Sequence, residues 1–249
     1  MTADSVIVDV SQDWAVACGV QERFMEVPRA QSRALTYSAR CRQMRALGGD
    51  CFDILPLPGR RVALTVADAS GKGLPAALII ANVQSSLRTA ALFAPGDAAA
   101  VVTAVNRQLY ASSPAERYAT LFYGVFDEDT RTLHYVNAGH NAPIIMRRDG
   151  SISWLESGGP PVGLFADADY QARVIHLSFD DLMVAYTDGV VETPNSSGEE
   201  WGVGGLLGAV AASPLREPVR IVQNAFAALD EFSGDGQTDD ATVLAAIVN

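Results

Sequence analysis

Apolar residues recur at two spacings along the chain, and these spacings predict a mixture of helices and strands. Helical spacing between Trp14 and Phe24 predicts a helix over residues 11–27, which Pro28 should end. Three further apolar stretches are predicted to form helices: residues 74–92, residues 97–111 with Asp97 as the N-cap, and residues 217–230.

Shorter apolar runs between these helices are predicted to be strands. They cover residues 34–44, 52–61 with a turn, 61–68, 118–127, 132–139, 142–148, 172–179, 181–189 and 241–248. Because the helices do not alternate strictly with single strands, the order favours α+β layers over a doubly wound parallel sheet. The loops at residues 157–163 and 193–205 are rich in Gly, Pro and Ser, and we expect them at the surface near the functional site.

Composition fits a folded cytoplasmic protein. The chain has 249 residues, of which 49% are hydrophobic and 19% charged, which suits a globular domain with a substantial core. Its net charge of −11 argues against nucleic acid and anionic membranes as partners. No apolar run approaches the ~20 residues that span a bilayer. Cys18, Cys41 and Cys51 are odd in number and lack C-x-x-C spacing, which predicts a reducing compartment and no zinc site.

The segment DASGKGLPAALII, residues 68–80, raises a separate question because it carries the only lysine of the chain, Lys72. A phosphate-binding loop has the pattern G-x-x-x-x-G-K-[ST]. Here Val66 stands where the first glycine should be, and Gly73 replaces the hydroxyl residue. A nucleotide-dependent switch is therefore disfavoured, and the segment is predicted to be a strand end, a tight turn and a helix entered through Pro75.

Aspartates stand at the ends of several predicted strands, usually beside glycine. Turn capping explains any single one of them, since Asp is a preferred turn residue. Several carboxylates gathered at one end of a sheet repel each other, and their burial is costly unless cations offset the charge. Oxygen ligands without His or Cys suit hard cations such as Mg²⁺ or Mn²⁺. The aspartates concerned are Asp50, Asp53, Asp68, Asp188, Asp239 and Asp240.

Seven motifs in order give the chain a family resemblance: GGDCFD, DASGKGLPAALI, YATLFYGVFD, YVNAGHNAP, GGPPVGLF, AYTDGVVE and TDDATVLAAI. They resemble the PPM-type (protein phosphatase 2C-like) metal-dependent serine/threonine phosphatases, and most of all their bacterial SpoIIE/RsbU branch. The resemblance spans residues 35–248. It implies a four-layer αββα sandwich of two antiparallel sheets flanked by helix pairs, with two Mn²⁺ or Mg²⁺ ions at one end.

The resemblance also implies roles for individual residues. Asp68 matches the ligand that bridges both metals, and Ala69 matches a position that offers its backbone carbonyl. Asp50 matches the acidic ligand of the first motif. Asp188 and Asp239 match the two late ligands of the second metal. These residues are the expected catalytic centre.

Other motif residues are expected near the metals without binding them. Asp53 and Asp240 are expected behind the ligands. In the turn at Gly71 and Lys72, the lysine is expected to pair with a neighbouring carboxylate, to approach substrate phosphate or to point into solvent. His140 is expected to fix a turn between two strands, and a role as general acid is the alternative. Candidates for contact with the substrate phosphate are Arg40, Arg42 and Arg45.

The implied activity is hydrolysis of phosphoserine or phosphothreonine on a bacterial regulatory protein, typically a STAS-type anti-sigma-factor antagonist, by attack of a metal-bridging water. The competing hypothesis is a catalytically silent module of the same fold that binds a phosphoprotein or a regulator. The presence of every expected metal aspartate favours the enzyme. Residues 31–249 are expected to form the phosphatase domain, and residues 1–30 a helical extension for docking, dimerisation or regulation. An upstream regulator and a homodimer are both left open.

Overall fold

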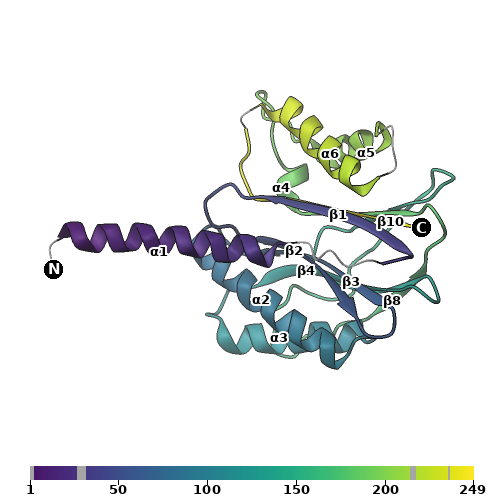
Figure 1. The fold of residues 1–249 in the computed structure, drawn as a ribbon, viewed down its shortest axis with the longest axis horizontal. Helices are drawn as coiled ribbons and strands as arrows, with labels where there is room; N and C mark the ends of the chain where they lie inside the picture. The colour runs from purple at the N-terminus through teal and green to yellow at the C-terminus, as the bar shows by residue number, and fades with distance from the viewer. Residues whose placement is uncertain (1–2, 27–31, 214–216, 235) are drawn as a thin grey trace.

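Two five-stranded antiparallel sheets form the middle of the molecule, and helices cover their outer faces (Figure 1). The computed structural model describes residues 3–26, 32–213, 217–234 and 236–249. The layers follow the order helices, sheet, sheet, helices, which is the expected α+β, αββα sandwich. One helix at the N-terminal end projects away from these layers (Figure 1).

The elements have the following bounds. The first sheet has the order β1 (Leu35–Arg42), β10 (Ala241–Val248), β9 (Leu182–Tyr186), β6 (Ile144–Met146) and β7 (Ile152–Trp154). The second has the order β2 (Asp50–Leu57), β3 (Arg61–Ala69), β4 (Ala119–Asp127), β5 (Thr132–Ala138) and β8 (Arg173–His176). The helices are α1 (Ala3–Phe24), α2 (Leu74–Phe93), α3 (Ala98–Ser112), α4 (Asp188–Val191), α5 (Gly202–Ala211) and α6 (Pro218–Ser233).

Coverage on both faces explains why the central strands are apolar at nearly every position. In β10, Val243 and Ala245 pack beneath α5 and α6, while Leu244 and Ala246 pack between the two sheets. Successive side chains of a strand point to opposite faces, so one strand supplies two cores. The same alternation determines which carboxylates lie on the same face of a sheet.

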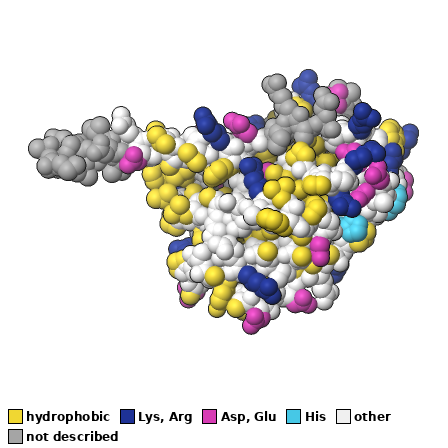
Figure 2. Space-filling view, turned by 60° about the horizontal axis from the view of Figure 1, so that its bottom comes forward, with side chains coloured by type: hydrophobic (Ala, Val, Ile, Leu, Met, Phe, Trp, Pro, Cys, Tyr) yellow, Lys and Arg dark blue, Asp and Glu magenta, His cyan; other side chains and the backbone are white. Residues whose placement is uncertain are grey.

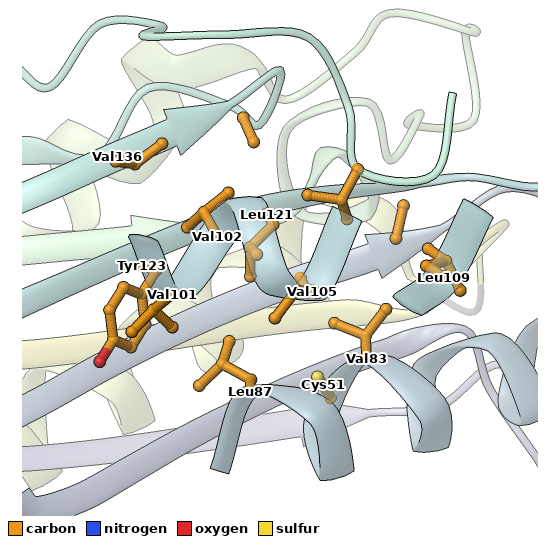
Figure 3. Close-up of a cluster of buried hydrophobic side chains, with 14 of the residues drawn as sticks. Cys51, Val83, Leu87, Val101, Val102, Val105, Leu109, Leu121, Tyr123 and Val136 are labelled. Carbon is orange, nitrogen blue, oxygen red and sulfur yellow. The ribbon is translucent and has the colours of Figure 1, made fainter. Parts of the chain in front are cut away.

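Helices α2 and α3 cover the outer face of the second sheet. Val83 and Leu87 of α2 and Val105 of α3 pack there against Cys51 and Tyr123 of the sheet (Figure 3). Among the described helices, only α2 is long and apolar enough to cross a membrane by length and composition. It packs against β2, β3 and α3, as expected for a helix that flanks the sandwich.

Four helical or strand assignments differ from the sequence expectation. Helix α1 begins at Ala3 instead of residue 11, and the stop expected at Pro28 and the boundary after residue 30 lie outside the described residues. Strand β7 and helix α4 were not expected. Helix α5 was also missed, because four glycines lower its intrinsic helix propensity. It forms because Leu206 and Val210 pack with α6 and the first sheet.

Candidate metal centre

Asp50 and Asp68 face each other across two neighbouring strands. Asp50 begins β2 and Asp68 lies next to the end of β3, and the antiparallel register pairs the two residues directly. Both share the strand parity of Phe52 and Val66, which pack between the sheets. The two carboxylates therefore lie at one end of the inner layer. Like charges directly opposite each other on adjacent strands are destabilising, so ionisation of both carboxyl groups would cost stability.

The opposite sheet holds Asp50 in place. The hydroxyls of Thr187 and Thr242 donate hydrogen bonds to Asp50 Oδ2 at 2.8 and 2.7 Å. The backbone N–H of Thr242 donates in turn to Thr187 Oγ1 at 2.9 Å. Asp50 is 1% exposed, and no Arg or Lys of the described residues forms an ion pair with it. Its carboxyl group is thus buried and oriented by two neutral hydroxyls, without a basic partner among the described residues.

Burial and neighbouring carboxylates disfavour ionisation at this end of the sandwich. Burial raises the pKa of Asp50 to about 8, against the opposing effect of the two threonine hydroxyls. Burial also raises the pKa of Asp68 to about 9, and the charges of Asp50, Asp188, Asp239 and Asp240 add to the increase. Asp68 is thus a carboxyl group whose pKa is raised by the charges of four other carboxylates, and we call these five aspartates the acidic cluster.

Asp188 and Asp239 complete this cluster from the first sheet. Asp188 is the first residue of α4, where burial and then the charge of Asp239 raise its pKa. Lys72 Nζ lies 2.6 Å from Asp239 Oδ2 and donates to the Thr238 carbonyl at 3.0 Å. Of the three alternatives for Lys72, the structure shows the ion pair with a neighbouring carboxylate. The side chains of Lys72 and Asp239 are 43% and 37% exposed, so this pair lies at the rim of the cluster.

Asp240 anchors the loop that leads into β2. Its carboxylate accepts hydrogen bonds from the backbone N–H of Met44 at 2.7 Å and of Gly49 at 2.6 Å. A Cβ atom on Gly48 would lie 2.5 Å from Asp240 Oδ2, so only glycine fits against this carboxylate. Asp240 therefore fixes the approach to Asp50 through the backbone.

Asp53 was expected near the metals but faces away from Asp50, whereas His140 contacts Thr120, the cross-strand partner of Asp68. Asp53 has the opposite strand parity to Asp50 and forms hydrogen bonds of 2.6 and 3.1 Å with Arg88 of α2. It links β2 to α2 on the outer face of the sheet. His140 Nδ1 lies 2.8 Å from Thr120 Oγ1, and the backbone N–H of His140 donates to Asn137. Burial lowers the pKa of His140 to about 4, which leaves a neutral imidazole that fixes the turn after β5.

The three arginines proposed as phosphate contacts separate in the structure. Arg40 and Arg42 both stack on Phe226 of α6, with guanidinium carbons 4.7 and 5.1 Å from the ring centroid. Arg42 also pairs with Asp230. Their strand parity on β1 turns them toward the outer helices, away from Asp50. Only Arg45, in the loop before β2, approaches the motif turn, where it lies beside Gly73.

Sequence reasoning missed three residues that support the cluster. Thr187 directly follows β9 and Thr242 lies in β10, and both are fully buried. Their spacing from Ala185 and Leu244, which pack between the sheets, could have predicted that they face the inner layer. Gln21 is a polar residue within the apolar stripe of α1. Its side chain donates to the Gly48 carbonyl at 2.7 Å and accepts from the Gly48 N–H at 3.1 Å. Helix α1 therefore holds the same loop that Asp240 holds.

The donor chemistry of the cluster fits hard divalent cations. Within the part of the chain that the structure describes, no group of three or more His, Cys, Asp or Glu side chains is already arranged as a metal-ligand set. The fit comes instead from an all-oxygen set whose carboxylates have raised pKa values. A bound cation favours the ionised form of such groups and offsets their mutual repulsion. The carboxylates whose charges act on one another at this end of the sandwich are Asp50, Asp68, Asp188 and Asp239, and Ala69 follows Asp68 in the chain.

Comparison with known proteins agrees with this geometry. The family model for Stage II sporulation protein E (SpoIIE) matches residues 58–249. The chain belongs to the SpoIIE family. Protein IcfG of Synechocystis is 24% identical over 260 residues, covering 92% of this chain and 40% of that protein. Phosphoserine phosphatase RsbU of Bacillus subtilis is 25% identical over 240 residues, covering 95% of this chain and 70% of RsbU. The chain thus spans less than half of the first relative and about two thirds of the second.

Solved structures share the fold. The RsbU and RsbW domains of a Mycobacterium tuberculosis protein superpose with a TM-score of 0.74 at 27% identity, covering 87% of this chain and 60% of that one. The SiaA PP2C domain of Pseudomonas aeruginosa gives a TM-score of 0.84 at 19% identity over all of both chains. The phosphatase PstP, solved with 2 manganese ions, gives 0.65 at 19% identity, covering 86% of this chain and 98% of PstP. The SpoIIE-family chain therefore has a PP2C-type fold.

Proposed function

We propose that this SpoIIE-family chain is a Mn²⁺- or Mg²⁺-dependent protein phosphatase acting on phosphoserine or phosphothreonine of a bacterial regulatory protein. The observation that carries the proposal is the acidic cluster around Asp68, in which Asp50 and Asp68 form no ion pair with any described Arg or Lys. RsbU, a relative along most of the chain, is a phosphoserine phosphatase. PstP, which shares the fold, binds two manganese ions.

Each residue of the cluster has a task in this proposal. Asp50, Asp68, Asp188, Asp239 and the carbonyl of Ala69 would hold two cations. When bound, the two cations supply an activated water nucleophile and neutralise charge on the phosphoryl oxygens. The protein contributes orientation and access.

The supporting residues keep the ligands fixed. Thr187 and Thr242 hold one oxygen of Asp50 and leave the other free. Asp240 fixes the loop before Asp50, and Lys72 offsets the charge of Asp239 at the rim. A ligand set held in this way loses less conformational entropy when a cation binds.

The cysteines fit a mechanism without a protein nucleophile. Burial raises the pKa of the Cys41 thiol and of the Cys51 thiol well above the usual range. A thiol needs its thiolate form to attack phosphorus, so neither residue supplies one. Hydrolysis then consumes one water, breaks the bond between phosphorus and the serine oxygen, and releases phosphate and a free hydroxyl.

The finer parts of the proposal come from the family resemblance. The substrate is a phosphorylated STAS-type protein of a partner-switching pathway, and the enzyme works in the cytoplasm. Residues 31–249 form the phosphatase domain, and residues 1–30 serve docking, dimerisation or regulation. The contact between Gln21 and the loop before Asp50 favours a regulatory use of α1.

The proposal is tested by phosphate release from a phosphoserine STAS-domain protein and from para-nitrophenyl phosphate, in Mn²⁺ and in EDTA. We expect turnover that depends on Mn²⁺ and falls about 100-fold or more in Asp68→Asn. Asp127→Asn is the matched control, because this strand-end carboxylate pairs with Arg61 far from the cluster. Binding of the phosphoprotein without any turnover would instead support the silent module.

A further inference from the structure

A groove opens between two helices next to the turn that follows Asp68. It has a volume of about 280 Å³ and lies between the start of α2 and the end of α3. Pro75, Leu78 and Ile79 of α2 and Pro114 after α3 give it apolar walls. Leu78 is 64% exposed, so its side chain is accessible to a ligand in the groove. Figure 2 shows this side of the molecule, with hydrophobic side chains gathered near the meeting point of α1 and the domain.

Arg117 joins this groove to the motif turn. It lines the groove, and its Nη1 donates to the Ser70 carbonyl at 3.2 Å. Gly71 has φ +95°, and a Cβ atom there would lie 2.6 Å from Arg117 Nη1. The glycine therefore leaves space that the guanidinium occupies. The Ser70 N–H donates to the Tyr118 carbonyl at 2.9 Å, and the Tyr118 N–H donates to Ser70 Oγ at 3.1 Å, so the backbone next to Arg117 is held against the motif turn.

A second arginine lies beside the same turn. Arg45 Nη1 would lie 3.2 Å from a Cβ atom on Gly73, two residues beyond Gly71. Among the described residues, neither Arg45 nor Arg117 takes part in an ion pair, whereas Lys72 between them pairs with Asp239. The chain has a net charge of −11, and these two exposed arginines lie beside the turn that follows Asp68. They favour an anionic ligand at this rim.

From these observations we infer that the groove between α2 and α3 binds the substrate polypeptide next to its phosphorylated residue. An apolar side chain of the substrate occupies the space beside Leu78, and Arg117, assisted by Arg45, binds an anionic group of the same segment. This inference rests on the proposed phosphatase function and adds its substrate-recognition surface. The partner is a peptide segment of the substrate, because Arg117 both lines the groove and bonds the Ser70 carbonyl in the turn that follows Asp68.

The test is a positional library of phosphoserine peptides in which one residue at a time is Leu, Asp or Ser. We expect the wild-type chain to prefer Leu at one position and Asp at another. Leu78→Ser should remove the Leu preference, and Arg117→Ala should remove the Asp preference, each through an increase of about tenfold in KM with little change in kcat. Hydrolysis of para-nitrophenyl phosphate, which has no flanking residues, should stay unchanged in both variants.

Matched controls separate recognition from folding. Arg220→Ala removes an exposed arginine of α6 on the opposite layer and should leave every preference intact. A fall of Arg117→Ala activity on para-nitrophenyl phosphate equal to that on peptides would show that Arg117 binds only the phosphoryl group, and would overturn the inference. A change of oligomeric state in Leu78→Ser with unchanged peptide preference would assign the groove to another copy of the chain and also overturn it.

Failure of the phosphatase proposal gives a different result. If the wild-type chain hydrolyses neither peptides nor para-nitrophenyl phosphate, peptide binding is measured by fluorescence anisotropy. Weaker binding by Leu78→Ser and Arg117→Ala than by Arg220→Ala would keep the groove as a binding surface while the activity is rejected. Equal binding by all three variants would reject the groove as well.

Discussion

At the scale of single residues, the main feature is a set of carboxylates held where their charge is costly. Asp50 and Asp68 pair across two strands, and burial raises the pKa of both. A protein gains no stability from such a pair by itself, so its presence points to a ligand of opposite charge. Asp53 gives a contrast: three residues after Asp50 and on the opposite face of β2, the same residue type forms an ion pair with Arg88.

The first prediction concerns stability in EDTA. The folded-state pKa of Asp68 is about 9, against 3.8 in the unfolded chain. Because this folded-state pKa is raised, the contribution of Asp68 to stability is fully present below the unfolded value and is lost as pH rises through the folded value. Urea unfolding should therefore give a lower free energy of unfolding at about pH 8.5 than at about pH 6. Asp68→Asn should show a shallower dependence; an equal slope in both proteins would contradict the assignment.

The second prediction concerns His140. Its pKa of about 4 leaves it neutral near pH 7, and Thr120 holds its Nδ1. We expect His140→Gln to lose about 1 kcal/mol of stability and to keep the shape of the pH–rate profile. Loss of one limb of that profile in the variant, with the fold intact, would show that His140 acts as an acid or base.

At the scale of elements, helix α1 is connected to the cluster through one loop. Gln21 binds both polar backbone groups of Gly48, and the next residue, Gly49, binds Asp240. At its C-terminal end, the carbonyl of Phe24 accepts a hydrogen bond of 2.7 Å from Gln84 of α2. A movement of α1 would therefore displace the loop that precedes Asp50, because Gln21 is bonded to that loop.

The third prediction tests this connection. Gln21→Ala removes both hydrogen bonds to Gly48 and leaves two buried backbone groups without partners, at a cost of about 1–3 kcal/mol. We expect a higher Mn²⁺ concentration for half-maximal activity, with only a small change in kcat at saturating metal. Glu22→Ala, which changes the adjacent exposed residue, is the control. Equal Mn²⁺ dependence in the two variants would separate α1 from the metal site.

The sequence predicted elements with strong periodicity and missed those that tertiary contacts create. The strand ends at Asp50 and Asp68 could be located from apolar runs, and the Asp97 cap was correct. Helix α5 could not be predicted, since its glycines are unfavourable without the packing of Leu206. The positions of Arg40 and Arg42 depend on Phe226, which is far away in sequence and comes close only in the fold.

At the scale of the whole molecule, the sandwich brings together carboxylates from distant parts of the chain. The second sheet supplies Asp50 and Asp68, and the segments around β9 and β10 supply Asp188 and Asp239. The two sheets must therefore pack in the correct register for the cluster to exist. Bound cations would stabilise this arrangement by mass action, because the unfolded chain lacks the site.

The most direct test of the central claim is a calorimetric titration of the chain with Mn²⁺. We predict two ions per chain for the wild type, strongly weakened binding of both in Asp68→Asn, and unchanged binding in Asp127→Asn, whose carboxylate pairs with Arg61 at the far end of β4. Unchanged Mn²⁺ binding by Asp68→Asn would contradict the assignment of the acidic cluster as the metal centre.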